Sequence, residues 1–528
     1  MHARQELRTR NRRIIWNNDG DDLQVPAQLG SPGMDKDLYY EGYEHFPRRF
    51  ETVDDYLKQR MKGKIDNTQV DSVFYCGYTS VPNWEFPLTN IGKIGPDPLQ
   101  HTVKFAHDNR MEFFYSFRMN DIHLSAHRAY WLWSDFRKAN LHLLHGQVDR
   151  EWFEKKFVPW LKGEVEEHPL VKAIEPGWKF FWPWEPSPPK PTNFRSWAAF
   201  DFGFKEVRDY YLGLVREACR RYDLDGIEFD WGRTPPFFKI EHRANAPVMT
   251  DFMRQVRRIL DEAGQKRGKP ILFATRVPDS QAWSLNCGLD VPAWLKGNLI
   301  DLLIAGFGSH PFSFPIGEWV HLGHTHKIPV YGCIENGLPE QGKTEVIRAT
   351  AQRYWSAGVD GIYLYNHFDE DRRDYNLSGY TNIVHFKETL YDIGDPARLK
   401  NLDKVYGVDW YCSPDLPVRF STESGPSKAS VSFDIADDPT PAKSVILQVQ
   451  WAADVDVSRI SLRLNGEAVP PGQSFVMDRE TDNQGWYAHP VSSLRQGKNV
   501  LEMTAQPSAT GSDKLLLRQV RTLIRYSQ

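Results

Sequence analysis

The sequence lacks any long apolar segment. No run of about 18 apolar residues, the length that crosses a membrane as a helix, occurs among the 528 residues. The first residues, Met1 to Arg13, are polar and basic and contain no apolar core of a signal peptide. We therefore expect no membrane partner, and a secreted or periplasmic location would require a leader that has already been removed.

Cysteines and an excess of charge are also scarce. The five cysteines are far apart and never in CxxC spacing, so the sequence signals neither a zinc cluster nor a disulfide framework. Lys and Arg number 65 against 69 Asp and Glu, a net charge of -4, so the charge balance indicates no nucleic-acid partner. The Asp-Gly-Asp-Asp segment 19–22 lacks the spacing and the closing glutamate of a calcium loop. We expect no obligatory metal and no other cofactor.

Several motifs of common enzymes are absent as well. The chain has no GxSxG elbow, HExxH helix or Walker loop, and no GxGxxG follows its first expected strand. Serine hydrolases, zincins and nucleotide- or dinucleotide-binding enzymes need these parts. Aromatic residues are abundant instead, with 18 Trp and 22 Tyr. Such rings stack on sugar faces and also fill large cores, so both interpretations stay open.

Short apolar runs alternate with amphipathic helical stretches over most of the chain. Strands that alternate with helices indicate a parallel sheet, and eight such units close a (β/α)8 TIM barrel. The expected strands are residues 13–17, 71–78, 111–118, 226–230, 270–276, 301–307, 328–335 and 361–366. The expected helices include residues 52–61, 98–109, 205–221, 248–267, 318–327 and 344–357.

The pattern changes toward the C-terminus, which predicts a second domain. We expect the barrel over residues 1–395, with a long insertion at about 121–200 that either builds the site or forms a peripheral subdomain. An irregular connector, 396–428, leads to short strands with turns over 429–528. The turn pair Asn465-Gly466 favours antiparallel pairing, hence a β-sandwich accessory domain that braces the barrel or binds carbohydrate.

The fourth expected strand carries the most informative pattern. Its side chains alternate, so Glu228 and Asp230 share one face while Ile227 and Phe229 share the other. Ionised carboxylates are costly to bury without partners, so two acids on the inward face indicate a polar cleft at the end of this strand. The alternative is a buried ion pair with nearby arginines.

The ends of the barrel strands carry the candidate catalytic residues, because TIM-barrel active sites lie at that face. Asp230 and Glu335 end the fourth and seventh expected strands. Glycoside cleavage needs one carboxyl group to protonate the leaving oxygen and another to attack or to activate water. We expect Asp230 to be the acid/base and Glu335 the nucleophile or the water-activating base, and the reverse assignment stays open.

Other polar or aromatic residues at the strand ends are predicted to bind substrate. Glu228 would position Asp230 or raise its pKa, and the alternative that Glu228 is itself catalytic stays open. The arginines either neutralise these acids or bind an anionic group of the substrate, and the histidines either donate to sugar hydroxyls or are bystanders. Trp231 is the best candidate for a sugar-stacking ring. The predicted set is Glu228, Arg118, Asn120, His123, Trp231, Arg233, Arg276, His310, Asn366 and His367.

Two segments carry a resemblance to a known group of proteins. They are residues 200–230, from Phe-Asp-Phe-Gly through a helix to Asp-Gly-Ile-Glu-Phe-Asp, and residues 357–366, Ala-Gly-Val-Asp-Gly-Ile-Tyr-Leu-Tyr-Asn. Over most of residues 10–395 the chain resembles the glycoside-hydrolase-like TIM barrels of bacteria, a group that contains family-10-like glycosidases of unassigned specificity. The resemblance implies that Asp-Gly-Ile-x-x-Asp ends in a functional acid, here Asp230.

The same strand is similar to the family 18 chitinase motif, Asp-Gly-x-Asp-x-Asp-Trp-Glu. This chain departs from that motif twice, with Glu228 in place of the middle Asp and Gly232 in place of the proton-donating Glu. The loss of that donor argues against chitinase activity. It also keeps open a non-catalytic sugar-binding barrel, unless Glu335 supplies the missing acid.

Taken together, these patterns predict a glycosidase that hydrolyses a poly- or oligosaccharide with two carboxyl groups. The arginines and histidines favour an anionic substrate, sulfated or uronic. Two alternatives remain: a non-catalytic carbohydrate-binding barrel, and a polysaccharide lyase, which would need a Tyr, His or Lys base near an arginine-neutralised uronate.

Overall fold

The structure is a computed structural model of the chain. It describes residues 2–18, 20, 52–62, 65–78, 97, 99–125, 130, 133–146, 149–165, 196–307, 312, 314–335, 344–365, 386–409, 412–413, 415–421, 425–452, 456–475, 485–507 and 515–526. The chain divides into two compact units. The first comprises Met1–Phe307, Ile316–Glu335 and Val359–Leu377, and the second comprises Gly308–Pro315, Asn336–Gly358 and Ser378–Gln528.

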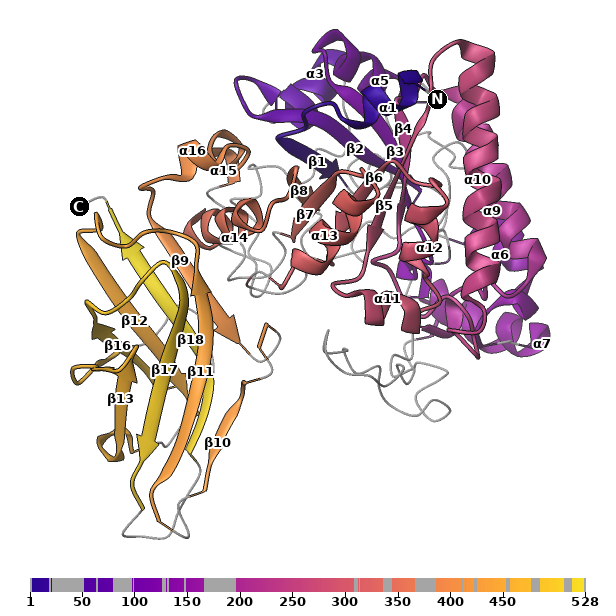
Figure 1. The fold of residues 1–528 in the computed structure, drawn as a ribbon. Helices are drawn as coiled ribbons and strands as arrows, with labels where there is room; N and C mark the ends of the chain where they lie inside the picture. Colours follow the sequence, from indigo (N-terminus) through magenta and orange to yellow (C-terminus); the bar gives the residue numbers. More distant parts are fainter. Residues whose placement is uncertain are drawn as a thin grey trace. The chain divides into compact units, whose positions relative to one another are not determined.

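The first unit is built around a closed barrel of eight parallel strands (Figure 1). Neighbours pair in chain order, and β8 closes the barrel by pairing with β1. The predicted (β/α)8 barrel is therefore confirmed. The strands are β1 (Ile14–Asn18), β2 (Val70–Tyr78), β3 (Glu112–Arg118), β4 (Gly226–Asp230), β5 (Leu272–Val277), β6 (Leu302–Ala305), β7 (Val330–Glu335) and β8 (Gly361–Tyr365).

Helices connect these strands. The helix predicted at residues 205–221 is observed with the same bounds, and it buries Val207, Tyr211 and Leu214 at helical spacing. The helices of the first unit are α1 (His2–Arg8), α3 (Val53–Leu57), α5 (Leu99–Asp108), α6 (Asp135–Ala139), α7 (Arg150–Trp152), α8 (Val158–Leu161), α9 (Lys205–Arg221), α10 (Ala246–Arg267), α11 (Gln281–Asn286), α12 (Val291–Lys296) and α13 (Gly317–Thr325). Of the described helices, none has the length and apolarity needed to cross a membrane.

A repeated contact fixes the N-terminal end of the barrel. At the start of each even-numbered strand, an aspartate Oδ2 accepts a hydrogen bond from a backbone N–H at the start of the preceding strand. We call these four residues the pinning aspartates. The pairs are Asp71 with Arg13 (2.8 Å), Asp225 with Phe113 (2.8 Å), Asp301 with Phe273 (2.9 Å) and Asp360 with Val330 (2.8 Å).

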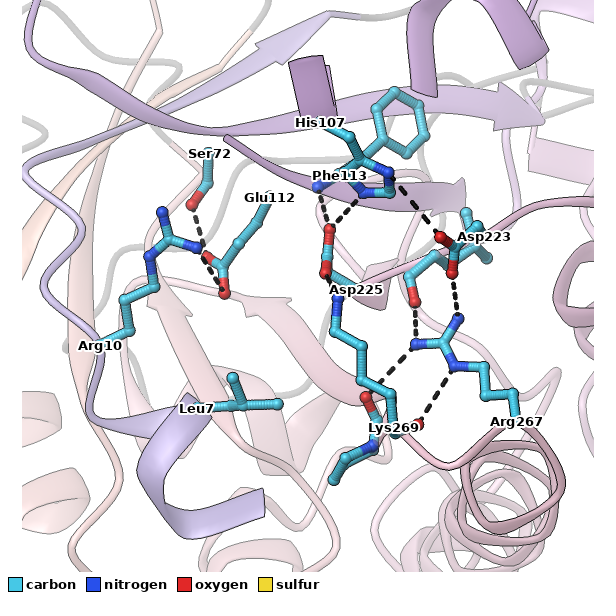
Figure 2. Close-up of polar contacts among 12 residues, drawn as sticks. Leu7, Arg10, Ser72, His107, Glu112, Phe113, Asp223, Asp225, Arg267 and Lys269 are labelled. Atoms are coloured by element: carbon cyan, nitrogen blue, oxygen red, sulfur yellow. Dashed lines mark hydrogen bonds and ion pairs between the residues drawn. The ribbon is translucent and has the colours of Figure 1, made fainter. Parts of the chain in front are cut away.

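Each pinning aspartate also meets a basic side chain. Figure 2 shows Asp225 against the backbone of Phe113, the ring of His107 and the amine of Lys269. The His107 Nε2 atom lies 2.8 Å from Asp225 Oδ2. A charge-assisted hydrogen bond of this kind ties the connections of neighbouring strands together.

The second unit contains two antiparallel sheets, so the predicted C-terminal sandwich is confirmed. One has the order β10-β18-β12-β16-β15, with β9 also pairing with β18, and the other has the order β11-β17-β13-β14. Side chains from both sheets, among them Phe433, Leu447 and Leu501, share one core. The strands are β9 (Lys404–Asp409), β10 (Val418–Phe420), β11 (Ser427–Ile435), β12 (Ser444–Trp451), β13 (Ile460–Leu464), β14 (Glu467–Ala468), β15 (Gln473–Phe475), β16 (Gly485–Pro490), β17 (Gly497–Ala505) and β18 (Leu515–Arg525).

The predicted Asn465-Gly466 turn joins β13 to β14, and both residues have positive φ (53° and 87°), the conformation that this pair favours. The connector 396–428, however, is not irregular, because it contributes β9 and β10 to the sheet around β18. Helices α14 (Thr344–Ser356), α15 (Phe386–Asp392) and α16 (Pro396–Leu399) also belong to the second unit. The boundaries expected from the sequence, 1–395, 396–428 and 429–528, stay a prediction.

Candidate functional site

Strand register brings three of the predicted site residues into one row. Arg118 on β3 pairs with Asp230 on β4, and Asp230 pairs with Arg276 on β5. One level closer to the N-terminal end, Ser116 pairs with Glu228. Paired residues of a parallel sheet point to the same side, and here alternation directs the polar set inward while Phe229 packs outward against Phe252 of α10.

Asp230 is held by a two-pronged ion pair. Arg276 Nε donates to its Oδ1 at 2.7 Å and Nη2 donates to its Oδ2 at 3.0 Å, while the backbone N–H of Gly232 donates to Oδ1 at 2.8 Å. Burial raises the pKa of Asp230, but the charges of Arg276, Arg233 and Arg118 outweigh it and leave the pKa below its ordinary value. The buried carboxylate is therefore ionised.

Gly232 makes room for this ion pair. A Cβ atom at this position would lie 2.2 Å from Arg276 Nη2 and 2.9 Å from Asp230 Oδ1. The guanidinium thus lies against the backbone at the place where the family 18 motif has its glutamate. Arg276 also donates from Nη1 to the Phe307 carbonyl oxygen at 2.8 Å, which fixes its orientation.

Glu228 has the opposite protonation. It is fully buried, and its Oε2 accepts a hydrogen bond from Ser116 Oγ at 2.5 Å. Burial, and then the charge of Asp230, raise its pKa to about 7, against the pull of the Ser116 and Tyr363 hydroxyls and of Arg276. Two carboxyl groups on one strand are therefore separated by their surroundings into one ionised and one protonated group below neutral pH.

Glu335 ends β7 on the inward face of the barrel. It alternates with the buried inward residues Tyr331 and Cys333, pairs in register with Tyr365 of β8, and is half-buried. Burial raises the pKa of the Cys333 thiol, and the charges of Glu335 and Asp230 add to that shift. Both predicted catalytic carboxylates therefore lie within electrostatic reach of one thiol.

Three arginines gather around the ring of Tyr365. The guanidinium carbons of Arg276, Arg233 and Arg118 lie 3.6, 5.2 and 5.4 Å from its centre. Guanidinium groups at this distance are attracted by the electron-rich face of an aromatic ring. Tyr365 was not among the predicted site residues. Its inward position at the end of β8 is the signal that could have found it.

Asn120, which the sequence predicts to bind substrate, is bonded to the protein backbone. Its Nδ2 donates to the Phe200 carbonyl oxygen and its Oδ1 accepts from the Phe200 N–H, both at 2.9 Å. The side chain is fully buried and fastens the end of β3 to the returning chain. Its left-handed backbone (φ 58°) is one that asparagine tolerates.

Trp231 is also placed differently from the prediction. It is fully buried among Phe202, Phe229, Phe237 and Trp294, on the face of β4 opposite to Asp230. That placement argues against a sugar-stacking role, because strand alternation directs the ring after Asp230 outward. Of the remaining predicted residues, His310, Asn366 and His367 and the side chain of His123 lie outside the described part of the structure.

Within the described ranges, no three His, Cys, Asp or Glu side chains are arranged to hold a metal ion. Among the described residues, the strand ends carry carboxyl groups, guanidinium groups and phenols. An ionised carboxylate next to guanidinium groups can stabilise a cationic transition state, and a partly exposed carboxyl group can transfer a proton.

No family model matches this chain, and no curated protein is significantly similar to it in sequence. Solved structures are similar at low identity. They include the PgaB glycoside hydrolase domain of Bordetella bronchiseptica (TM-score 0.37, 10% identity, 72% of this chain and 99% of that one) and the chitinase ChiA74 of Bacillus thuringiensis (0.35, 9%, 97% and 100%). A Paenibacillus sp. cycloisomaltooligosaccharide glucanotransferase is similar with a TM-score of 0.33 and 10% identity, over 91% of this chain. This chain covers 58% of that enzyme. Similarity at this level identifies neither a reaction nor a substrate, and the family-10-like identity stays a prediction.

Proposed function

We propose that the barrel is a glycoside hydrolase that cleaves a glycosidic bond in a poly- or oligosaccharide. The observation that carries this proposal is the pair of inward carboxylates at the strand ends, Asp230 on β4 and Glu335 on β7, in unlike surroundings. Glycosidases need one carboxyl group that stays ionised and another that exchanges a proton.

Asp230 takes the role of the ionised carboxylate. Its bidentate pairing with Arg276 and its lowered pKa oppose the acid/base role expected from the sequence, because a general acid must hold a proton near the working pH. The reverse assignment is therefore the better one. Because the Asp230 carboxylate is buried, it would act through its charge on the positive charge that develops on the sugar ring.

Glu335 takes the role of the acid/base. It is half-buried at the end of β7, whereas Glu228 is fully buried one level deeper and bonded to Ser116. A group that protonates a leaving oxygen must reach the substrate. Glu228 is then a positioning residue whose protonated form leaves Asp230 as the only charged carboxylate of the pair.

The finer part of the proposal is an anionic substrate, sulfated or uronic, supported by the three arginines around Tyr365. A polysaccharide lyase is less well supported, because burial raises the pKa of both Tyr363 and Tyr365 and makes each phenol a poor base. A non-catalytic sugar-binding barrel is favoured by one observation, the guanidinium of Arg276 beside Gly232 in place of a glutamate.

Product analysis on neutral, uronic and sulfated polysaccharides separates these functions. New reducing ends without unsaturation indicate hydrolysis, unsaturated ends indicate elimination, and tight binding without products indicates a binding protein. Asp230→Asn and Glu335→Gln should each lower turnover by at least about a thousandfold while sparing ligand affinity.

Glu228→Gln is the matched control, since an amide resembles the protonated acid. It should retain turnover below neutral pH. Loss of turnover in Glu228→Gln with activity kept in Glu335→Gln would transfer the acid role to Glu228. Unchanged turnover in Asp230→Asn would refute the carboxylate pair.

A further inference from the structure

We infer that Arg233 is the specificity-determining residue that recognises the anionic group of a glycan, a carboxylate or a sulfate. The inference rests on the proposed function for the sugar part of the ligand. The charge preference itself is a property of Arg233 that binding alone can measure.

The surroundings of Arg233 leave its guanidinium available. It follows β4 in the turn after Asp230, is half-buried, and contacts the ring of Tyr365 at 5.2 Å. Over the described ranges it forms no ion pair and no hydrogen bond, and its buried Nε has no partner. A buried donor without a partner has lost its hydration without a compensating hydrogen bond, so such a group calls for an explanation.

The two neighbouring arginines are differently engaged. Arg276 donates from Nε and Nη2 to Asp230 and from Nη1 to the Phe307 carbonyl oxygen. Arg118 is almost fully buried and has Asp121 at 3.9 Å from its Nη1. Arg233 is therefore the cation of this cluster that an incoming group can reach.

The need to neutralise Asp230 does not explain why Arg233 lies beside the two other arginines. The charge of Arg233 contributes to the low pKa of Asp230, but Arg276 supplies the largest lowering effect and the direct contacts. Holding a third guanidinium near two others has an electrostatic cost, and an anion bound at Arg233 would offset it. The planar fork of arginine fits carboxylates and sulfates with two parallel hydrogen bonds.

The local backbone fixes where Arg233 stands. Thr234, the next residue, has φ 40°, a left-handed conformation that a β-branched residue rarely adopts. Backbone strain of this kind is concentrated at binding sites, where the surrounding structure maintains it. The Arg233 side chain, next to this residue, lies against the ring of Tyr365.

Calorimetric titration of the full chain with paired probes tests the inference. The first pair is an oligogalacturonate and its carboxyl-reduced counterpart, and the second is a chondroitin sulfate oligosaccharide and its desulfated counterpart. The wild type should prefer at least one acidic probe over its neutral counterpart by about tenfold or more. Arg233→Gln should remove that preference and leave the affinity for the neutral probe unchanged.

Arg216→Gln is the matched control, since it removes the same charge from an exposed position on α9 and should keep the full preference. Arg233→Lys keeps the charge but lacks the planar guanidinium, so it should retain only part of the preference for the acidic probe. Equal or absent binding of both acidic probes, or a full preference in Arg233→Gln, overturns the inference. If Arg233 sets the preference but no glycan is hydrolysed, the hydrolase proposal fails and this inference stands.

Discussion

The two ends of the barrel use charged residues in different ways. At the N-terminal end, four pinning aspartates repeat one contact, each accepting from the backbone of the preceding strand. At the C-terminal end, the charged groups that the structure describes follow no repeat. One carboxylate is paired with Arg276, one carboxyl group has a raised pKa, and Arg233 has no ionic partner among the described residues.

From this difference we infer that charged residues serve stability at the N-terminal end and function at the C-terminal end. A buried carboxylate with several partners satisfies its charge and fixes strand register, so a repeat of it serves the fold. A buried acid with a raised pKa reduces stability as it ionises, and natural proteins retain such groups mainly at functional sites. Substitutions at each end of the barrel test this contrast.

The largest effect is expected at Asp301. Its fully buried carboxylate contacts Arg4 at 2.7 Å, Arg8 at 2.8 Å and Arg257 at 2.9 Å, besides the Phe273 N–H. Asp301→Asn leaves three guanidinium groups without their shared counter-charge. We expect a loss of about 3–5 kcal/mol in the free energy of unfolding, measured by urea titration with tryptophan fluorescence.

Asp360→Asn is the control within the same repeat. Asp360 is 40% exposed and its basic partner, His324, is 45% exposed, so solvent screens the pair. The asparagine oxygen can still accept from the Val330 N–H. We expect a loss of about 1 kcal/mol or less. Equal losses in the two variants would contradict the view that burial and partner number set the strength of these contacts.

The strands were predictable because the barrel leaves a strong local signal. Each is a short run rich in apolar residues between turns, and the bounds of β4 and of helix α9 agree with the sequence pattern. The pinning aspartates also leave a signal, an aspartate at the start of every second strand. The strands β9 and β10 could not be predicted in the same way, because their pairing depends on β18, far along the chain.

The location of the site could be predicted from the sequence, but most of its side-chain contacts could not. Barrel topology directs Asp230, Arg276 and Glu335 inward at the strand ends. Which partner each side chain selects depends on atoms far apart in sequence, such as Asn120 with the backbone of Phe200, 80 positions away. No sequence pattern distinguishes an amide that binds sugar from one that fastens a loop.

The next effect concerns the C-terminal end and has a pH signature. The folded-state pKa of Glu228, about 7, lies above its ordinary value of 4.5. The folded protein therefore binds the extra proton between these values, and its stability falls as the pH rises through this window. Glu228→Gln lacks the titration, so relative to the wild type it should gain roughly 1–3 kcal/mol between pH 4.5 and 8, measured by urea titration.

Glu262→Gln on the exposed face of α10 provides the comparison for Glu228→Gln. It should follow the wild type at every pH within about 0.5 kcal/mol. A constant difference between wild type and Glu228→Gln across this range would show that Glu228 keeps an ordinary pKa in the folded protein.

The smallest effect is expected at the N-terminal end of the barrel. There the fold favours the charged form of His107, whereas at the other end it favours the uncharged form of Glu228. The hydrogen bond with Asp225, and the charges of Asp225 and Asp223, raise the pKa of His107 above 6.5 against the effects of burial and of Lys269. The protonated ring stabilises the fold, so this contribution is fully present below pH 6.5 and is lost as the pH rises through the folded-state pKa.

In a Glu228→Gln background, which removes the other titration, His107→Gln should cost about 1 kcal/mol or less at pH 6 and still less at pH 8.5. His321→Gln, at an exposed position on α13, should show no such dependence. A His107→Gln cost that is the same at both pH values would mean that the ring acts by packing and not by charge, and the N-terminal end would then lose its pH-sensitive pair.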